Sequence, residues 1–438
     1  MKIAVNQQTG GDGTTETGAG TTTTANVPAS RWCRRHTAVL TVGAALSTAV
    51  ACGLGATAIA SAAPTHAQQA FGSSARHVVE RATATLASPE VMLPAGKVGT
   101  RSQIPWGQVG SGWALAEYTK ATIRRASMVT LYLIDPAGGM YSEYRWPSSK
   151  SAWNLVDWSG DKARALFTGP AAGHQVAMHQ LMLATGKVVS FPLPASVQPL
   201  AYTRPSGKNM LAFDRGVVRY NLAGVFQARL TNQTAWAGYG VISSPDGMSV
   251  AVPAKTGVTL VSNANGKALQ LPVPVHGGCV PVRWWNSGTL LASCIPPQTA
   301  GPQLWLVPVN GARPTALTPV RNGKGPDLGD MDAWRMDGGE YLQALGGCGT
   351  VFIGKQEPRG AVKVINVPDS SANNLVVVTT SRRMLVSERV GCMPSVSLVW
   401  FNPLTSAVQR VLTVPPSELG VISVVAYNRD ASQPAFMP

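Results

Sequence analysis

The sequence is short of the residues that acid–base catalysis and metal binding require. Asp and Glu together number 21 in 438 residues, His numbers six, and charged residues of both signs make up 13% of the chain. The motifs G-x-S-x-G, HExxH and the phosphate-binding loop are missing, so no local signature of a serine hydrolase, a zinc protease or a nucleotide-binding enzyme is found. A pattern for a long helix is also missing after residue 93. The sequence therefore favours an all-β protein without an evident catalytic centre.

A turn signal followed by an apolar run is the main feature that the sequence does have. It returns roughly every 40 to 50 residues, a period typical of propeller blades. Its copies lie at 110–112, 157–162, 204–208, 244–247, 284–288, 334–338 and 381–383. Each copy is followed later in its repeat by a strand in which apolar and polar residues alternate, such as Gln303–Val307. In most repeats a turn pair such as Thr185-Gly186 comes next and supplies the positive φ of a tight hairpin. Each repeat thus predicts four short strands.

Seven such repeats predict a seven-bladed β-propeller of four-stranded antiparallel blades over residues 105–430. A blade of this size cannot bury both of its faces alone, so the copies must stack around an axis. After the seventh repeat, Gly420–Tyr427 is a strand with no repeat behind it, and we expect it to pair with the first repeat and close the ring. The aromatic residues before the turns are expected to pack between blades: Trp158, Tyr202, Trp284, Trp285 and Trp334.

The turn motif resembles the W-S-P-D-G-K-x-hydrophobic repeat of TolB-like β-propellers. Asp157–Phe167 and Ser243–Val252 carry it best, and the resemblance covers roughly residues 105–427. The layout is similar to that of exported TolB-like propeller proteins of high-GC actinobacteria, without the N-terminal α/β domain of TolB. The resemblance implies a blade architecture and no particular activity, because the motif serves turn formation and packing.

The N-terminal part predicts export. Residues 1–36 form a Gly- and Thr-rich segment with a basic end, expected to be a disordered cytoplasmic tail. The apolar segment 37–67 is expected to be either a cleaved signal peptide or a membrane anchor. A twin-arginine signal at Arg34-Arg35 and lipidation at Cys52 are alternative interpretations. With 68–104 as a linker, the propeller would be secreted or extracytoplasmic, and would touch the membrane only through its N-terminal segment.

Cysteine use agrees with export. Cys279, Cys294, Cys348 and Cys392 fall within the expected propeller, an even number that suggests two disulfides in an oxidising compartment. The pairing Cys279–Cys294 with Cys348–Cys392 is preferred among the three connectivities, because the first pair brackets one predicted hairpin. A zinc site is disfavoured because no CxxC spacing exists. We expect no metal and no cofactor.

Two groups of residues are candidates for a metal-binding or catalytic site. Asp327, Asp330 and Asp332 form the one acidic concentration, and loop carboxylates suit Ca²⁺, but the spacing is not that of an EF-hand. We prefer a structural or solvated loop. His174 and His179 flank a predicted strand and would point to opposite faces, and His276 lies in a Pro- and Gly-containing loop; all three histidines are interpreted as surface residues.

The charge balance indicates the kind of partner. From Gln68 onward the chain has 32 Lys and Arg against 19 Asp and Glu, which favours anionic partners. The basic residues are dispersed rather than gathered in a patch, which argues against specific nucleic-acid binding. We expect a monomeric, non-catalytic propeller that binds an envelope protein or an anionic wall or surface polymer. The alternative is an extracellular propeller hydrolase or lyase that acts on a polysaccharide or lactone, with several convergent Asp, Glu or His at its mouth.

Overall fold

The structure is a computed structural model, and it describes only part of the chain. Residues 92–427 are described except for 123–124, 148–152, 233–239, 276, 297–300, 322–327, 347–349, 371–372, 390–394 and 416–418. The chain divides into two units, Met1–Thr83 and Ala84–Pro438, and every described residue belongs to the second. Within the described residues no helix is long and apolar enough to cross a membrane. The predictions for the tail, the apolar segment and most of the linker lie outside them.

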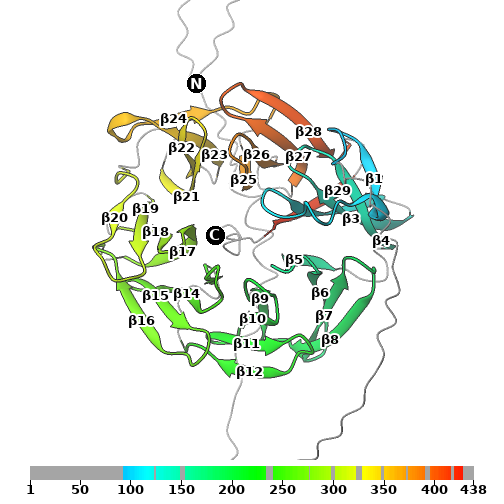
Figure 1. Cartoon of the computed structure of the whole chain (residues 1–438), viewed down its shortest axis with the longest axis horizontal. Coiled ribbons are helices and arrows are strands. Elements are labelled where there is room, and N and C mark those ends of the chain that lie inside the picture. The colour runs from blue at the N-terminus through cyan, green and yellow to red at the C-terminus, as the bar shows by residue number, and fades with distance from the viewer. Residues whose placement is uncertain are drawn as a thin grey trace, which may run out of the picture. The chain divides into compact units, whose positions relative to one another are not determined.

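Four-stranded antiparallel sheets follow one another along the chain (Figure 1). The strands of the first half are β2 (Ala114–Thr122), β3 (Arg125–Ile134), β4 (Met140–Pro147); β5 (Asn154–Trp158), β6 (Arg164–Ala172), β7 (Gln175–Met182), β8 (Val188–Pro194); β9 (Gln198–Tyr202), β10 (Asn209–Phe213), β11 (Val217–Asn221), β12 (Phe226–Arg229); and β13 (Ile242–Ser243), β14 (Ser249–Ala254), β15 (Gly257–Ser262), β16 (Ala268–Pro272). Those of the second half are β17 (Cys279–Asn286), β18 (Thr289–Cys294), β19 (Gln303–Pro308), β20 (Thr315–Ala316); β21 (Gly329–Met336), β22 (Gly339–Leu345), β23 (Val351–Gln356), β24 (Val362–Ile365); β25 (Asn373–Thr379), β26 (Met384–Arg389), β27 (Ser395–Asn402), β28 (Ala407–Thr413); and β29 (Leu419–Ala426). In Figure 1 the groups are arranged in chain order around a common centre. The described unit is all-β and has the arrangement of a β-propeller, as predicted.

Three pairings link strands that belong to different groups. β29 pairs antiparallel with β2 over eight positions, from Ala114 opposite Ala426 to Ala121 opposite Leu419. This is the expected pairing of the last strand with the first repeat. By contrast, β14 pairs with β17 and β27 pairs with β29 at one position each. Apart from the long β2–β29 pairing, the groups within the longer sheets therefore touch at a single residue pair.

Part of the expected linker contributes to the first group. β1 (Val98–Thr100) pairs in parallel with β4, and the 3-10 turn η4 (Arg101–Gln103) follows it. The backbone of Leu93 also donates to the Tyr141 hydroxyl at 3.0 Å. Three residues show no periodicity, which is why the sequence pattern did not reveal β1. A second 3-10 turn, η8 (Pro358–Gly360), lies between β23 and β24.

The hydrophobic core consists of clusters that each join two successive groups. Neighbouring residues of one strand enter different clusters: Leu115 packs with Trp158 and Phe167 of the following group, whereas Ala114 packs with Trp400 of the last group. The same division separates Leu166 from Phe167, Leu211 from Ala212, and Leu291 from Ala292. Since successive residues of a strand point to opposite faces, each group is apolar on both faces and is covered on both sides.

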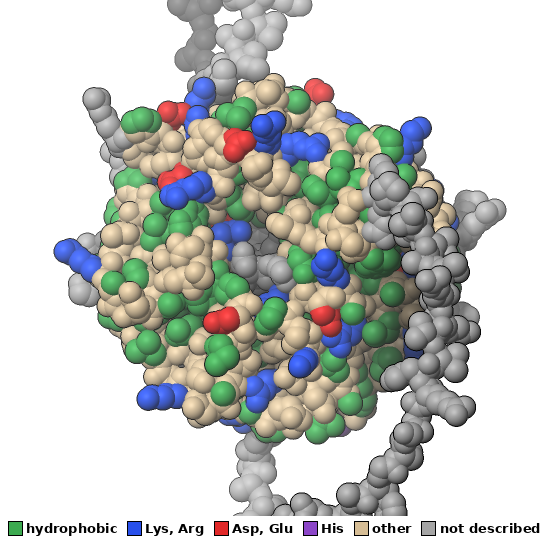
Figure 2. Space-filling view, viewed as in Figure 1, with side chains coloured by type: hydrophobic (Ala, Val, Ile, Leu, Met, Phe, Trp, Pro, Cys, Tyr) green, Lys and Arg blue, Asp and Glu red, His purple; other side chains and the backbone are tan. Residues whose placement is uncertain are grey.

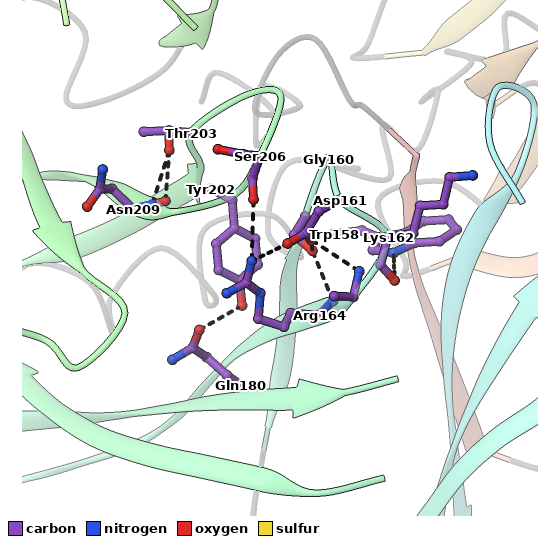
Figure 3. A network of polar contacts seen from close by, with 12 residues as sticks. Trp158, Gly160, Asp161, Lys162, Arg164, Gln180, Tyr202, Thr203, Ser206 and Asn209 are labelled. Atoms are coloured by element: carbon purple, nitrogen blue, oxygen red, sulfur yellow. Dashed lines mark hydrogen bonds and ion pairs between the residues drawn. The ribbon is translucent and has the colours of Figure 1, made fainter. Parts of the chain in front are cut away.

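The repeated turn motif is a hydrogen-bonded unit. In the best copy the Ser159 hydroxyl donates to Asp161 at 2.5 Å and accepts from the Arg164 amide at 2.9 Å. The copy at Ser244 and Asp246 has the same bonds, at 2.5 Å between the side chains and 2.9 Å from the Ser249 amide. Figure 3 shows Arg164 between Asp161 and Ser206 of the next group. The motif therefore forms a turn and a contact between sheets, as its interpretation as a packing motif requires.

Cys279 and Cys294 form a disulfide across the β17–β18 hairpin. The two residues are directly opposite each other in the register and are fully buried. One of the two predicted bonds is thus present. Cys348 and Cys392 lie outside the described residues, so the second bond stays a prediction.

A buried ion pair joins the β5–β8 group to the β9–β12 group. Both oxygens of Asp157 accept from the Arg204 guanidinium, at 2.9 and 3.0 Å, and one also accepts from the Tyr202 amide at 2.7 Å. Both side chains are nearly inaccessible, at 2% and 7% exposure. A pair of this kind depends on both partners, because either charge alone would be buried without compensation.

We predict that Asp157→Asn destabilises the protein by about 3–5 kcal/mol, because it leaves the Arg204 guanidinium buried without its counter-ion. Asp157→Asn combined with Arg204→Met should recover part of this loss, because neither charge is then buried. Urea unfolding of the three variants beside the unmodified protein measures the difference. Equal unfolding midpoints for the unmodified protein and Asp157→Asn would contradict the role assigned to this pair.

Candidate functional site

The predicted acidic cluster does not converge on one point in the described residues. Asp330 is fully buried and accepts from Arg321 at 3.1 Å, whereas Asp332 pairs with Arg283 of β17. A bulge in β21 between Asp330 and Asp332 shifts the register between them. The third member, Asp327, lies outside the described residues. Asp330 and Asp332 lie on the strand β21 and not in a loop, so the predicted loop was wrong for these two residues, because both pair with β22. Their carboxylates neutralise different arginines, which is a structural role.

The two described histidines have different surroundings. His174 is exposed, as predicted. His179 is not a plain surface residue: its ring stacks on Trp153 with centroids 4.2 Å apart, and Nδ1 lies 2.7 Å from the Ser190 hydroxyl. Burial lowers the pKa of His179. His276 lies outside the described residues. Within the described parts of the chain, no three His, Cys, Asp or Glu side chains are grouped to hold a metal ion.

The five aromatic residues before the turns divide into two kinds. Trp158, Tyr202 and Trp334 are buried between groups, which confirms their packing role. Trp284 and Trp285 are only half-buried, although each also packs against a core cluster. The exposed parts of this second pair face a cavity, so packing alone does not describe them.

The cavity lies between β17 and β21, the first strands of two successive groups. Its volume is about 260 Å³, below the roughly 300–1,000 Å³ typical of sites for drug-sized ligands. It is lined by residues of β17 and β21 and by one residue of β25: Arg283, Trp284, Trp285, Asn286, Ala333, Trp334, Arg335 and Thr379. The Trp284 ring packs against the cluster shared with β13–β16, and Trp334 is buried in the cluster shared with β25–β28, whereas Trp285 packs against the cluster between the two groups. A cavity of this size and composition can take one small group with an apolar face and negative charge.

Each arginine of the cavity is held by a carboxylate and by an indole ring. Nε and Nη2 of Arg283 donate to the two oxygens of Asp332, and its guanidinium lies 4.9 Å from the Trp334 ring centroid. Arg335 donates to Glu340 at 2.8 Å and lies 5.5 Å from the Trp285 ring. Neither carboxylate belongs to the lining. Each carboxylate offsets the charge of its arginine, so the cavity presents oriented guanidinium N–H donors, and those of Arg335 are the more exposed.

The same lining offers little for catalysis. It contains no Asp, Glu, His, Cys, Lys or Tyr, so no residue in it is suited to exchange a proton near neutral pH. Thr379 and Asn286 provide neutral hydrogen-bonding groups, and neither has a base beside it in the lining. What the arrangement can do is hold an anionic, partly apolar group by charge and stacking.

The carboxyls with strongly raised pKa lie elsewhere, in the first group of strands. Burial raises the pKa of Glu117 to about 7, although the Leu155 amide donates to its carboxylate at 2.8 Å. Burial raises the pKa of Glu143 to about 8, against the opposing charge of Arg101, and neither oxygen of Glu143 has a hydrogen-bond partner. Both side chains are 5% exposed and neither lines the cavity. They lie within the packing of the sheets.

We predict that Glu143 makes the protein less stable at alkaline pH. Its folded pKa of about 8 is above the ordinary value of 4.5, so its contribution to stability is complete below about pH 4.5 and is lost as the pH rises through 8. At about 1.4 kcal/mol per pKa unit between 4.5 and 8, the loss is on the order of 5 kcal/mol. Thermal unfolding between pH 5 and 9 should show a falling Tm, with a smaller contribution from Glu117.

The matched variants are Glu143→Gln, which keeps the shape and removes the ionisation, and Glu357→Gln, which removes a carboxyl elsewhere. Glu143→Gln should reduce the alkaline loss, and Glu357→Gln should leave it unchanged. A Glu143→Gln protein with the same pH profile as the unmodified one would show that Glu143 is ionised throughout this range.

Comparison with known proteins extends to fold alone. No protein-family model and no curated protein matches this chain. A prolyl endopeptidase structure is similar with TM-score 0.50 and 11% identity, over 72% of this chain and 49% of that one. TolB from Acinetobacter baumannii gives 0.41 and 10%, over 71% and 66%, and oligogalacturonate lyase from Vibrio parahaemolyticus gives 0.44 and 12%, over 69% and 86%. This chain thus spans about half of the endopeptidase and about two-thirds of TolB. Such low identities do not separate catalysis from binding.

Proposed function

We propose that the protein is an exported β-propeller that binds a ligand or partner at the cell envelope and does not catalyse a reaction. One observation carries the proposal: the lining of the cavity between β17 and β21 includes two arginines, each paired with a carboxylate, and three tryptophans, and it contains no group suited to proton transfer. Catalysis needs titratable groups held together in a pocket. The described carboxyls with raised pKa, Glu117, Asp135 and Glu143, are buried and are not part of this lining.

The proposal includes a ring of seven blades closed by β29. Two features support it. β29 pairs with β2 over eight positions, so strands from the two ends of the described region share one sheet. Core clusters also lie between successive groups, and one of them joins the β2–β4 strands to β26, β27 and β28. The Tyr427 hydroxyl, one residue after β29, donates to the Gly160 carbonyl at 2.6 Å and adds a contact to the next group.

Export is part of the same proposal. The buried disulfide between Cys279 and Cys294 supports it, because such bonds persist in oxidising compartments. The apolar segment 37–67, whether cleaved or kept as an anchor, would deliver the propeller there. We propose that the propeller acts as a monomer outside the cytoplasm.

We predict binding without turnover. The purified full-length protein is incubated with polygalacturonate, with a polyglycerol phosphate and with neutral dextran, and binding is followed by co-sedimentation or calorimetry. New reducing ends, unsaturated products and the opening of a lactone panel are measured in the same samples. The expected result is saturable binding of at least one acidic polymer and no product above the level of heat-inactivated protein.

Product formation by the active protein would favour the hydrolase or lyase instead. The product would have to be absent from a second preparation purified from cells that do not express the protein, because a contaminating enzyme would otherwise explain it. Absence of binding to all three polymers, with no turnover, would contradict a polymer partner and leave an envelope protein as the binding partner to test.

A further inference from the structure

Arg335 is an exposed guanidinium that is held in one position. It lies on β21 directly opposite Glu340 on β22, to which Nη2 donates at 2.8 Å. The guanidinium also lies over the Trp285 ring, 5.5 Å from its centroid. These contacts use one nitrogen and one face, and the side chain is still 69% exposed. A planar guanidinium fixed in this way can donate two parallel hydrogen bonds to an incoming carboxylate or phosphate.

Arg283 lies in the same lining but has a different environment. It is only 21% exposed, and its fork is turned toward Asp332. We therefore assign it a positioning role: it contacts the Trp334 ring and pairs with Asp332 of β21, and so fixes the wall of the cavity. Arg335 is the cation that a ligand can reach.

We propose that this cavity binds one unit of an anionic saccharide polymer, with the carboxylate or phosphate group of the unit on Arg335 and its sugar ring beside Trp285. The inference rests on the proposed binding function and names its ligand class and the contacting residues. The cavity, at about 260 Å³, accommodates one unit rather than a chain segment. Neighbouring units would then lie over the surface around it.

One observation favours a saccharide over an acidic peptide. The apolar part of the lining consists of tryptophans and Ala333, with no Leu, Ile, Val or Met to form the kind of pocket that anchors an apolar peptide side chain. Basic side chains are dispersed across the face of the protein in Figure 2, not gathered in one place. Dispersed charge suits an anionic polymer of either kind, because each contact is then weak and repeated, so the choice of a saccharide rests on the lining.

The test measures affinity by calorimetry at constant ionic strength with the full-length protein. The probes are a galacturonate hexamer, a glycerol phosphate hexamer, a neutral maltohexaose and a hexaglutamate peptide. The variants are Arg335→Gln, Arg335→Lys and Trp285→Leu. The control is Arg229→Gln. Arg229 also pairs with a carboxylate, that of Asp214, but it lies on β12 and not at the cavity. Thermal unfolding of each variant shows whether it is folded.

The expected result is that one acidic saccharide binds, that maltohexaose does not, and that Arg335→Gln weakens binding by about 10-fold or more, as the loss of a charged hydrogen bond predicts. The affinity of Arg335→Lys should lie between those of the unmodified protein and Arg335→Gln, because lysine keeps the charge and lacks the planar pair of N–H donors. Trp285→Leu should also weaken binding, and Arg229→Gln should not. The two acidic saccharides distinguish a carboxylate from a phosphate ligand.

Three outcomes would overturn the inference. Equal losses for Arg335→Gln and Arg229→Gln would show that binding depends on net charge alone. Tighter, Arg335-dependent binding of hexaglutamate would assign the cavity to a peptide. Binding of an acidic saccharide unaffected by Arg335→Gln would place the ligand elsewhere and leave the proposed function intact, whereas turnover of the saccharide would contradict the proposed function itself.

Discussion

Every sheet of this protein is apolar on both faces, and the rest of the structure depends on covering them. Alternation along each strand sends one residue to the cluster on one side and the next residue to the cluster on the other, as with Leu291 and Ala292. No group of strands can bury both faces without a neighbour on each side. β29 pairs with β2, and one cluster contains residues of both the first and the last described group, so these two groups also cover faces of each other.

This constraint also positions the candidate site. The β17–β20 and β21–β24 groups are held together by a small cluster that contains Leu291, Leu304, Ala333 and Leu342. Ala333 belongs both to this cluster and to the cavity lining, so the cavity lies directly on the contact between the two groups. Its small side chain leaves space beside Trp285 that a larger residue would fill. The buried ion pair Asp157–Arg204 joins two other groups, and at this contact Arg283 pairs with Asp332 across the groups while the exposed Arg335 also lines the cavity.

The fold could be predicted from the sequence because successive repeats carry the same local signals. The Ser–Asp turn at Ser159 and Ser244, the alternating strands and the unmatched final strand are all local patterns, and the Cys279–Cys294 bond follows from one hairpin. The strand β1 was missed, because three residues carry no period. The short pairings between β14 and β17 and between β27 and β29 arise from tertiary packing and have no local signal.

The site could be predicted only in part. Trp284, Trp285 and Trp334 were identified as a group, but as packing residues, since their position before a turn does not show which will be half-buried. Arg283 and Arg335 are 52 positions apart in the sequence, and the cavity arises only when β17 and β21 pack side by side. A signal was present in retrospect: both copies of the motif place an arginine beside a tryptophan, at Arg283-Trp284 and Trp334-Arg335. The pairing of Asp332 with Arg283 could not be inferred, because a bulge in β21 sets its direction.

The central claim is that the cavity between β17 and β21 binds the carboxylate or phosphate group of a ligand and that the ligand does not react there. A crystal structure of the protein soaked with a short galacturonate or glycerol phosphate oligomer tests this most directly. The account predicts an intact ligand with two oxygens of its anionic group within about 3 Å of the Arg335 guanidinium nitrogens, and with Arg283 still paired to Asp332. A ligand bound at another surface, or a cleaved ligand in this cavity, would contradict it.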